Sequence, residues 1–170
     1  MAEVTWNVYS KISHNPKLQV EFSTCFFIQF AKVSLTHFIL SPKNTLIIPN
    51  CVEGIGSYAF GRGSTGLSTV VIPDSVKYIG YLAIFPQPLF IDGIKNLTIG
   101  AGVTEIAGEL ACSGTLTIKA TVPPTVTSNP IFNGEAGSPS KIYVPKESVE
   151  AYKTAENWSQ YADIIFAIEG

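Results

Sequence analysis

The sequence predicts a β-rich α/β solenoid, in which short parallel strands stack along one axis and a helical segment covers the C-terminal end. The first observation is an internal repeat: residues 48–60, 72–84 and 99–111 each carry Ile first, Val fifth and Ile eighth. The second copy starts 24 residues after the first, and the third starts 27 residues after the second. A period in the twenties is typical of solenoids, because each repeat buries its apolar face only against its neighbours.

The second observation is the composition of the chain. Of its 170 residues, 46% are hydrophobic and 14% are charged, which excludes a disordered chain and suits one domain with a substantial core. The 14 glycines and 11 prolines favour many short strands and turns over long helices. A solenoid presents a long repetitive surface, so a binding or structural role is the first expectation.

Charge and hydropathy exclude two classes of partner. The net charge of −2 gives no basic surface for nucleic acid or for an anionic membrane. The most apolar early stretch, residues 26–40, contains Lys32 and His37 and is too short to cross a bilayer. No secretory leader is recognised at the first residues. We therefore predict no nucleic-acid partner and no membrane insertion.

Residues 1–44 do not show the repeat. Val20, Phe22 and residues 26–30 are rich in aromatic and branched side chains, which favours strands. Three interpretations stay open: an atypical cap, a degenerate repeat, or residues outside the natural start of the fold. Without a good cap the first repeat would have an open strand edge, and self-association there would follow.

The repeat region is expected to span residues 45–140. Leu46 and Ile48 should point into the core while Thr45 and Ile47 point outward, because strand side chains alternate. Prolines directly after the strands, such as Pro73, end the pairing because they cannot donate a hydrogen bond. The same alternation is expected in later strands, which carry the inward pairs Val70/Ile72, Leu97/Ile99, Leu116/Ile118 and Ile142/Val144.

The end of the chain changes character. Residues 119–140 predict an irregular crossing, with Val126 and residues 131–132 as buried anchors. Residues 146–157 lack Gly and Pro and place apolar side chains on one side, which predicts a short amphipathic helix. Residues 141–170 are thus expected to form a cap, with a final short strand, in which Trp158 and Phe166 cover the apolar end.

These residues resemble a known family. The pattern Ile-Pro-x-x-Val-x-x-Ile-Gly-x-x-Ala-Phe of residues 48–60 is similar to BspA-like leucine-rich repeats of bacterial surface antigens. Residues 141–153 and Trp158 resemble the C-terminal cap of such proteins from Bacteroides-type bacteria. Over residues 45–170 the resemblance implies a right-handed leucine-rich-repeat solenoid. It also implies a location at the cell surface or outside the cell, and adhesion through host or extracellular-matrix proteins.

The sequence lacks the usual motifs of catalysis. Residues 61–66 match Gly-x-Gly-x-x-Gly, but a strand rather than a helix should follow them, so a turn between repeats is expected. The two histidines, His14 and His37, lie outside the repeats, and nothing places them beside a nucleophile. No His, Cys and carboxylate spacing fits a metal. We predict no catalytic residue, no cofactor and no metal site.

A glycoside hydrolase is a distant alternative. It would need two carboxylates facing each other across about 5 to 9 Å. The acids are scattered, and equivalent repeat positions should instead stack Glu53, Lys77 and Thr104 as neighbours.

The three cysteines, Cys25, Cys51 and Cys112, fit neither a disulfide framework nor a zinc site. We expect each to be a small buried hydrophobe, with a Cys25–Cys51 bridge as the alternative.

The surface with functional promise is the outward face of the parallel strands, a mostly uncharged strip of hydroxyl-bearing and β-branched side chains. Flat repetitive surfaces of this kind bind proteins or extended ligands. The competing interpretation is that threonine simply suits an exposed strand, which would leave a structural spacer. The candidate partner-binding residues are Thr69, Val71, Asn96, Thr98, Thr115 and Thr117.

Overall fold

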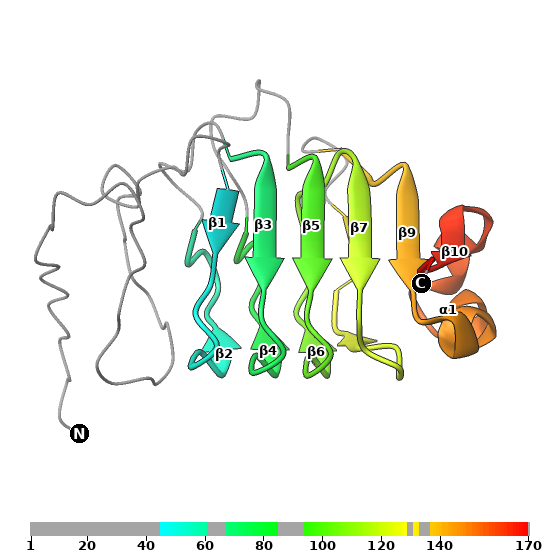
Figure 1. Ribbon diagram of the computed structural model, residues 1–170, viewed down its shortest axis with the longest axis horizontal. Helices are drawn as coiled ribbons and strands as arrows, with labels where there is room; N and C mark the ends of the chain where they lie inside the picture. The colour runs from blue at the N-terminus through cyan, green and yellow to red at the C-terminus, as the bar shows by residue number, and fades with distance from the viewer. Residues whose placement is uncertain (1–44, 61–66, 85–93, 129–130, 133–136, 170) are drawn as a thin grey trace, which may run out of the picture.

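The computed structural model describes residues 45–60, 67–84, 94–128, 131–132 and 137–169. These residues form a parallel-strand α/β fold with two parallel sheets and few helices (Figure 1). The expectations for residues 1–44 and for the turn at residues 61–66 lie outside the described residues. No helix in the described ranges has the length and apolar character that crossing a membrane requires.

A six-stranded parallel sheet forms the larger layer, in the order β1-β3-β5-β7-β9-β10. The first three strands follow one another at the repeat offsets of 24 and 27 residues, and Leu46, Val70 and Leu97 stand in register across them. The predicted inward side chains of these strands are all buried, which confirms the alternation. The strands are β1 (Thr45–Ile47), β3 (Thr69–Ile72), β5 (Asn96–Ile99), β7 (Thr115–Ile118), β9 (Lys141–Val144) and β10 (Ile165–Ala167).

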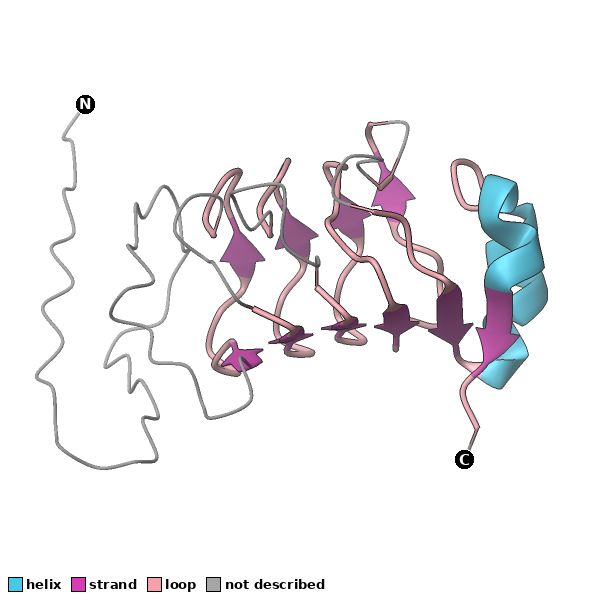
Figure 2. Ribbon diagram, turned by 90° about the horizontal axis from the view of Figure 1, so that it is seen from above, coloured by secondary structure: helices cyan, strands magenta, loops and turns pink. Residues whose placement is uncertain are grey.

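A four-stranded parallel sheet forms the second layer, in the order β2-β4-β6-β8. Figure 2 shows the strands of the two sheets as two rows on opposite sides of the molecule. Ile55, Ile79 and Ile106 stack in register and are fully buried, so they fill the space between the layers. Burying each such side chain contributes about 1.5–3 kcal/mol. The strands are β2 (Gly54–Ile55), β4 (Tyr78–Ile79), β6 (Glu105–Ile106) and β8 (Thr125–Val126).

The turns after the short strands repeat as closely as the strands do. Tyr58, Leu82 and Glu109 have positive φ angles of 59°, 47° and 50°, and they occupy equivalent positions in the three sequence repeats. For a non-glycine residue this conformation costs about 1–2 kcal/mol. The glycine that follows the second Ile of the repeat is required by packing. A Cβ on Gly80 would lie 2.3 Å from the backbone nitrogen of Ser57. The sequence repeat is therefore also a repeat of backbone conformation.

The C-terminal segment packs against the end of the six-stranded sheet (Figure 1). It contains η1 (Lys146–Ser148), α1 (Val149–Thr154) and η2 (Ser159–Ile164), followed by β10. The expected helix is confirmed over Lys146–Thr154 and ends short of the predicted boundary at residue 157.

Two buried aromatic side chains anchor this segment. The Tyr152 and Trp158 rings meet edge to face at 5.5 Å and are both fully buried. The Tyr152 hydroxyl donates to the Ala120 carbonyl at 2.9 Å, and Trp158 Nε1 donates to the Pro124 carbonyl at 2.9 Å. The buried polar atoms of both side chains are thus satisfied, as burial requires.

The crossing between β7 and β9 is anchored as predicted. Val126, Ile131 and Phe132 are all buried. Phe132 pairs with Leu110 in an isolated bridge and packs edge to face on Tyr161 at 5.0 Å.

The cysteine prediction needs a correction. Cys112 is free and fully buried, as expected for a small hydrophobe. Cys51 is instead half-buried and disulfide-bonded, which agrees with the alternative of a bridge, and Cys25 lies outside the described residues. Reading each cysteine as an independent apolar side chain is therefore wrong for Cys51, because sequence spacing does not reveal which thiols the fold brings together.

Candidate functional site

The outward-pointing side chains of the six-stranded sheet form two parallel columns, which together we call the strand face. Because strand side chains alternate, the columns lie two residues apart along each strand. Strand register aligns each column across the sheet. The first column contains Thr45, Thr69, Asn96, Thr115 and Lys141, and the second contains Ile47, Val71, Thr98, Thr117, Tyr143 and Phe166.

All six residues predicted to bind a partner lie together on the strand face. Asn96 is exposed, and the other five are partly exposed between their neighbours. From β1 to β7 both columns are uncharged; charge first enters at Lys141 on β9. The sheet therefore presents a flat, neutral strip to a ligand.

Three threonine hydroxyls on the strand face have no internal partner among the described residues. In the part of the chain that the structure describes, those of Thr98, Thr115 and Thr117 make no hydrogen bond. Each hydroxyl carries one donor and two acceptor positions. The strip can thus hydrogen-bond a ligand without first breaking an internal contact.

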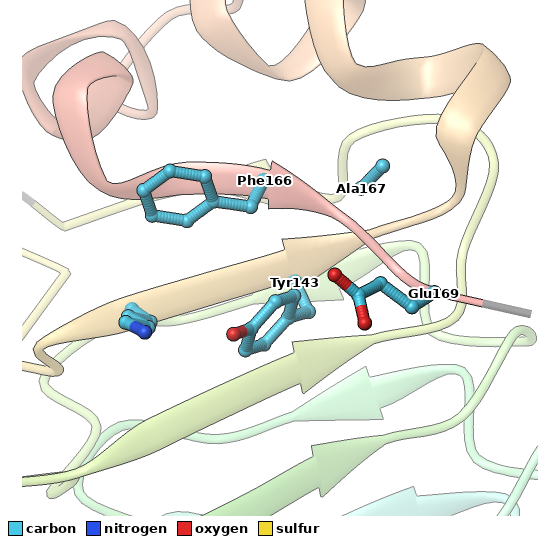
Figure 3. A pocket seen from close by; sticks show the side chains of 5 residues that line it. Tyr143, Phe166, Ala167 and Glu169 are labelled. Atoms are coloured by element: carbon cyan, nitrogen blue, oxygen red, sulfur yellow. The ribbon is translucent and has the colours of Figure 1, made fainter.

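A shallow pocket lies at the C-terminal end of the strand face, between β9 and β10 (Figure 3). Its volume is about 370 Å³, and it is lined by Lys141, Tyr143, Phe166, Ala167 and Glu169. The rings of Tyr143 and Phe166 lie 6.2 Å apart between centroids and are tilted by 45° to each other. These rings supply the aromatic anchors that the predicted residues lack.

Neither ring is among the binding residues predicted from the sequence, for different reasons. Tyr143 stands between the inward side chains of Ile142 and Val144, so strand alternation alone could have placed it outward. Phe166 was expected to help cover the apolar end, but its side chain is 44% exposed. It reaches the strand face because β10 pairs with β9 and places Phe166 beside Tyr143. Trp158 alone of that expected pair is buried.

A second aromatic cluster lies on the other side of the molecule. The Tyr58 and Tyr81 rings meet edge to face at 5.8 Å. The Tyr81 hydroxyl donates to Glu109 Oε1 at 2.8 Å. This hydrogen bond, more than desolvation or the nearby charge, raises the pKa of Tyr81. Tyr81 and Glu109 thus satisfy each other, which leaves less of this pair for a ligand to bind.

The remaining reactive groups do not form a catalytic arrangement within the described residues. Burial raises the pKa of the Cys112 thiol, which disfavours the reactive thiolate. Backbone hydrogen bonds from Lys77 to Glu53 and from Thr104 to Lys77 confirm the predicted column of these residues. No group of His, Cys, Asp and Glu in the described ranges is placed to hold a metal ion. His14 and His37 lie outside those ranges.

Comparison with known proteins adds no family to these observations. No protein-family model matches the sequence, and no curated protein matches it.

Proposed function

We propose that the chain is a right-handed leucine-rich-repeat solenoid of the BspA-like type, acting as a non-catalytic protein-binding or adhesion module. Three observations support the fold: in-register parallel strands, equivalent left-handed turns, and a distinct helical segment after the last repeats. The partner would be a host or extracellular-matrix protein, met at the cell surface or outside the cell.

The observation that carries the function is the neutral, hydroxyl-bearing strand face. Its side chains run in register across neighbouring strands, which suits an extended protein surface. Binding surfaces of proteins are depleted of charge at their centre, and the columns from β1 to β7 share that property.

Arginine substitution tests this proposal. Thr98→Arg or Thr117→Arg would place a bulky charge in the middle of the strand face, whereas Val122→Arg adds the same charge at a site that is already 75% exposed and lies elsewhere. Binding of the full chain to separately coated collagen, laminin and fibronectin is compared by biolayer interferometry. The expected result is binding to at least one protein, lost in the two threonine variants and kept in the control.

The alternative is a structural spacer that presents other domains. It predicts no binding to the coated proteins, or binding that the Thr98→Arg and Thr117→Arg variants leave unchanged. Self-association at the N-terminal edge stays a prediction, which sedimentation at several protein concentrations would test.

A further inference from the structure

We propose that the pocket between β9 and β10 binds the ring of an uncharged pyranose sugar. This inference goes beyond the proposed function, because a free sugar is its ligand and no protein partner is required. The pocket volume of about 370 Å³ lies near the lower end of the range for ligand sites, about 300–1,000 Å³. That size suits a monosaccharide or the end of a sugar chain.

The aromatic pair provides the first part of the argument. Phe166 and Tyr143 lie side by side on one face of adjacent strands (Figure 3), and their ring planes are tilted by 45° to each other. An aromatic ring carries negative charge on its face and positive charge at its edge. The C–H bonds on one side of a pyranose carry partial positive charge, so they pack favourably on such a face.

The polar groups around the rings provide the second part. Lys141 comes two residues before Tyr143 on β9, whereas Glu169 follows the end of β10, which runs parallel. The ammonium and the carboxylate therefore lie at opposite ends of the aromatic pair. A sugar hydroxyl both donates and accepts, so one hydroxyl of the ring can accept from Lys141 and another, at the far end, can donate to Glu169.

A third contribution comes from the neighbouring strand. Thr117 stands in register with Tyr143, and Thr115 stands in register with Lys141. Neither hydroxyl has a hydrogen-bond partner among the described residues. They lie on β7, outside the five lining residues, and offer donors and acceptors to a sugar chain that extends from the pocket across β9.

The charges select the class of sugar. The lining holds one cation and one anion, so an acidic or basic ligand would meet a like charge at one end. The lining also contains one carboxylate, Glu169, whereas hydrolysis of a glycoside uses a pair. The pocket chemistry thus favours binding of a neutral pyranose without cleavage.

The test is an NMR titration of the full, ¹⁵N-labelled chain with methyl β-glucopyranoside, methyl β-galactopyranoside and methyl α-mannopyranoside. We expect at least one of the three to shift the amides of residues 141–144 and 165–169. Phe166→Leu keeps an apolar side chain but removes the aromatic face, so it should weaken binding by about tenfold or more. Tyr143→Phe keeps the ring and should retain binding, and Tyr58→Leu is the matched control for an aromatic loss elsewhere.

Three results would overturn the proposal. The first is the absence of amide shifts at these residues with all three pyranosides. The second is sugar binding that survives in Phe166→Leu, which would show that the sugar does not pack on the aromatic face. The third is glucuronate binding more tightly than the neutral sugars, which would indicate recognition of charge. Because free sugars are the probe, each result is independent of whether a protein binds to the strand face.

Discussion

The two sheets use their hydroxyl groups in opposite ways. On the side of the four-stranded sheet, hydroxyls donate to the carbonyls of the preceding repeat: Ser75 to Val52 at 2.8 Å, and Thr125 to Thr104 at 3.2 Å. On the six-stranded sheet, the Thr98, Thr115 and Thr117 hydroxyls have no partner among the described residues. The same chemical group therefore joins repeats on one side of the molecule and faces solvent on the other.

Two tyrosine hydroxyls away from the strand face also have internal acceptors. Tyr81 donates to Glu109, and Tyr152 donates to the buried carbonyl of Ala120. The Tyr143 hydroxyl, on the strand face, makes no hydrogen bond to any described residue. This contrast suggests where stability and binding reside: substitutions on the four-stranded side should affect folding, and those on the strand face should affect recognition.

The largest effect is expected where the two sheets do not differ, in the shared core. Leu97→Ala and Ile106→Ala each remove a buried side chain, one from each sheet. Each should lower the free energy of unfolding by about 2–5 kcal/mol through lost burial and a residual cavity. Urea denaturation followed by circular dichroism measures both. A change below 1 kcal/mol for only one of them would show that the layers are not equally packed.

A smaller effect is expected for Tyr152→Phe, which keeps the ring but leaves the Ala120 carbonyl without its donor. The free energy of unfolding should fall by about 1–2 kcal/mol. Burial raises the pKa of the Tyr152 phenol, so the folded state holds this proton more tightly than the unfolded state. That stabilisation is complete below the ordinary pKa near 10 and is lost as the pH rises above it.

The pH dependence of Tyr152 gives an independent measurement. Thermal unfolding of the wild-type chain should shift to lower temperature as the pH rises above about 10, and Tyr152→Phe should weaken that dependence. Tyr143→Phe is the matched control, since its hydroxyl has no partner among the described residues. Identical alkaline behaviour of the wild type and Tyr152→Phe would contradict the prediction.

The smallest effects test the comparison itself. Ser75→Ala removes a hydrogen bond between repeats and should cost about 1 kcal/mol. Thr117→Val, on the strand face, keeps the β-branched shape and breaks no internal bond, so it should change stability by less than about 0.5 kcal/mol. Denaturant midpoints of the two variants decide the matter. If Thr117→Val proves as costly as Ser75→Ala, the division between the two sides does not hold.

Much of the fold could be predicted because the signals are local and repeated. The inward side chains of residues 46–48, 70–72 and 97–99 follow from strand alternation and the repeat offset, and the structure buries them all. The helix after residue 145 follows from a run without Gly or Pro. The six candidate residues also gather on one face, because register carries each column across the sheet.

The parts that escaped prediction depend on contacts between distant segments. Nothing in the local pattern around Phe166 shows that β10 pairs with β9. Because of this pairing, Phe166 is exposed on the strand face, although it was expected to cover the apolar end. The disulfide of Cys51 was expected only as the alternative to a free buried thiol, since spacing alone does not show which thiols the fold brings together. Left-handed backbone at Tyr58 and Leu82 is also hidden in sequence, because neither residue type favours it.

By itself the sequence determined which side chains face inward and which face outward, because a strand alternates with a period of two and the repeat keeps every strand in phase. Only the tertiary structure decided which polar groups on those faces are already satisfied. Whether a hydroxyl meets a carbonyl depends on the backbone of the neighbouring repeat, as Ser75 and Thr117 show. It also decided that Tyr143 and Phe166 share a pocket, because residues distant in sequence meet only when their strands pair.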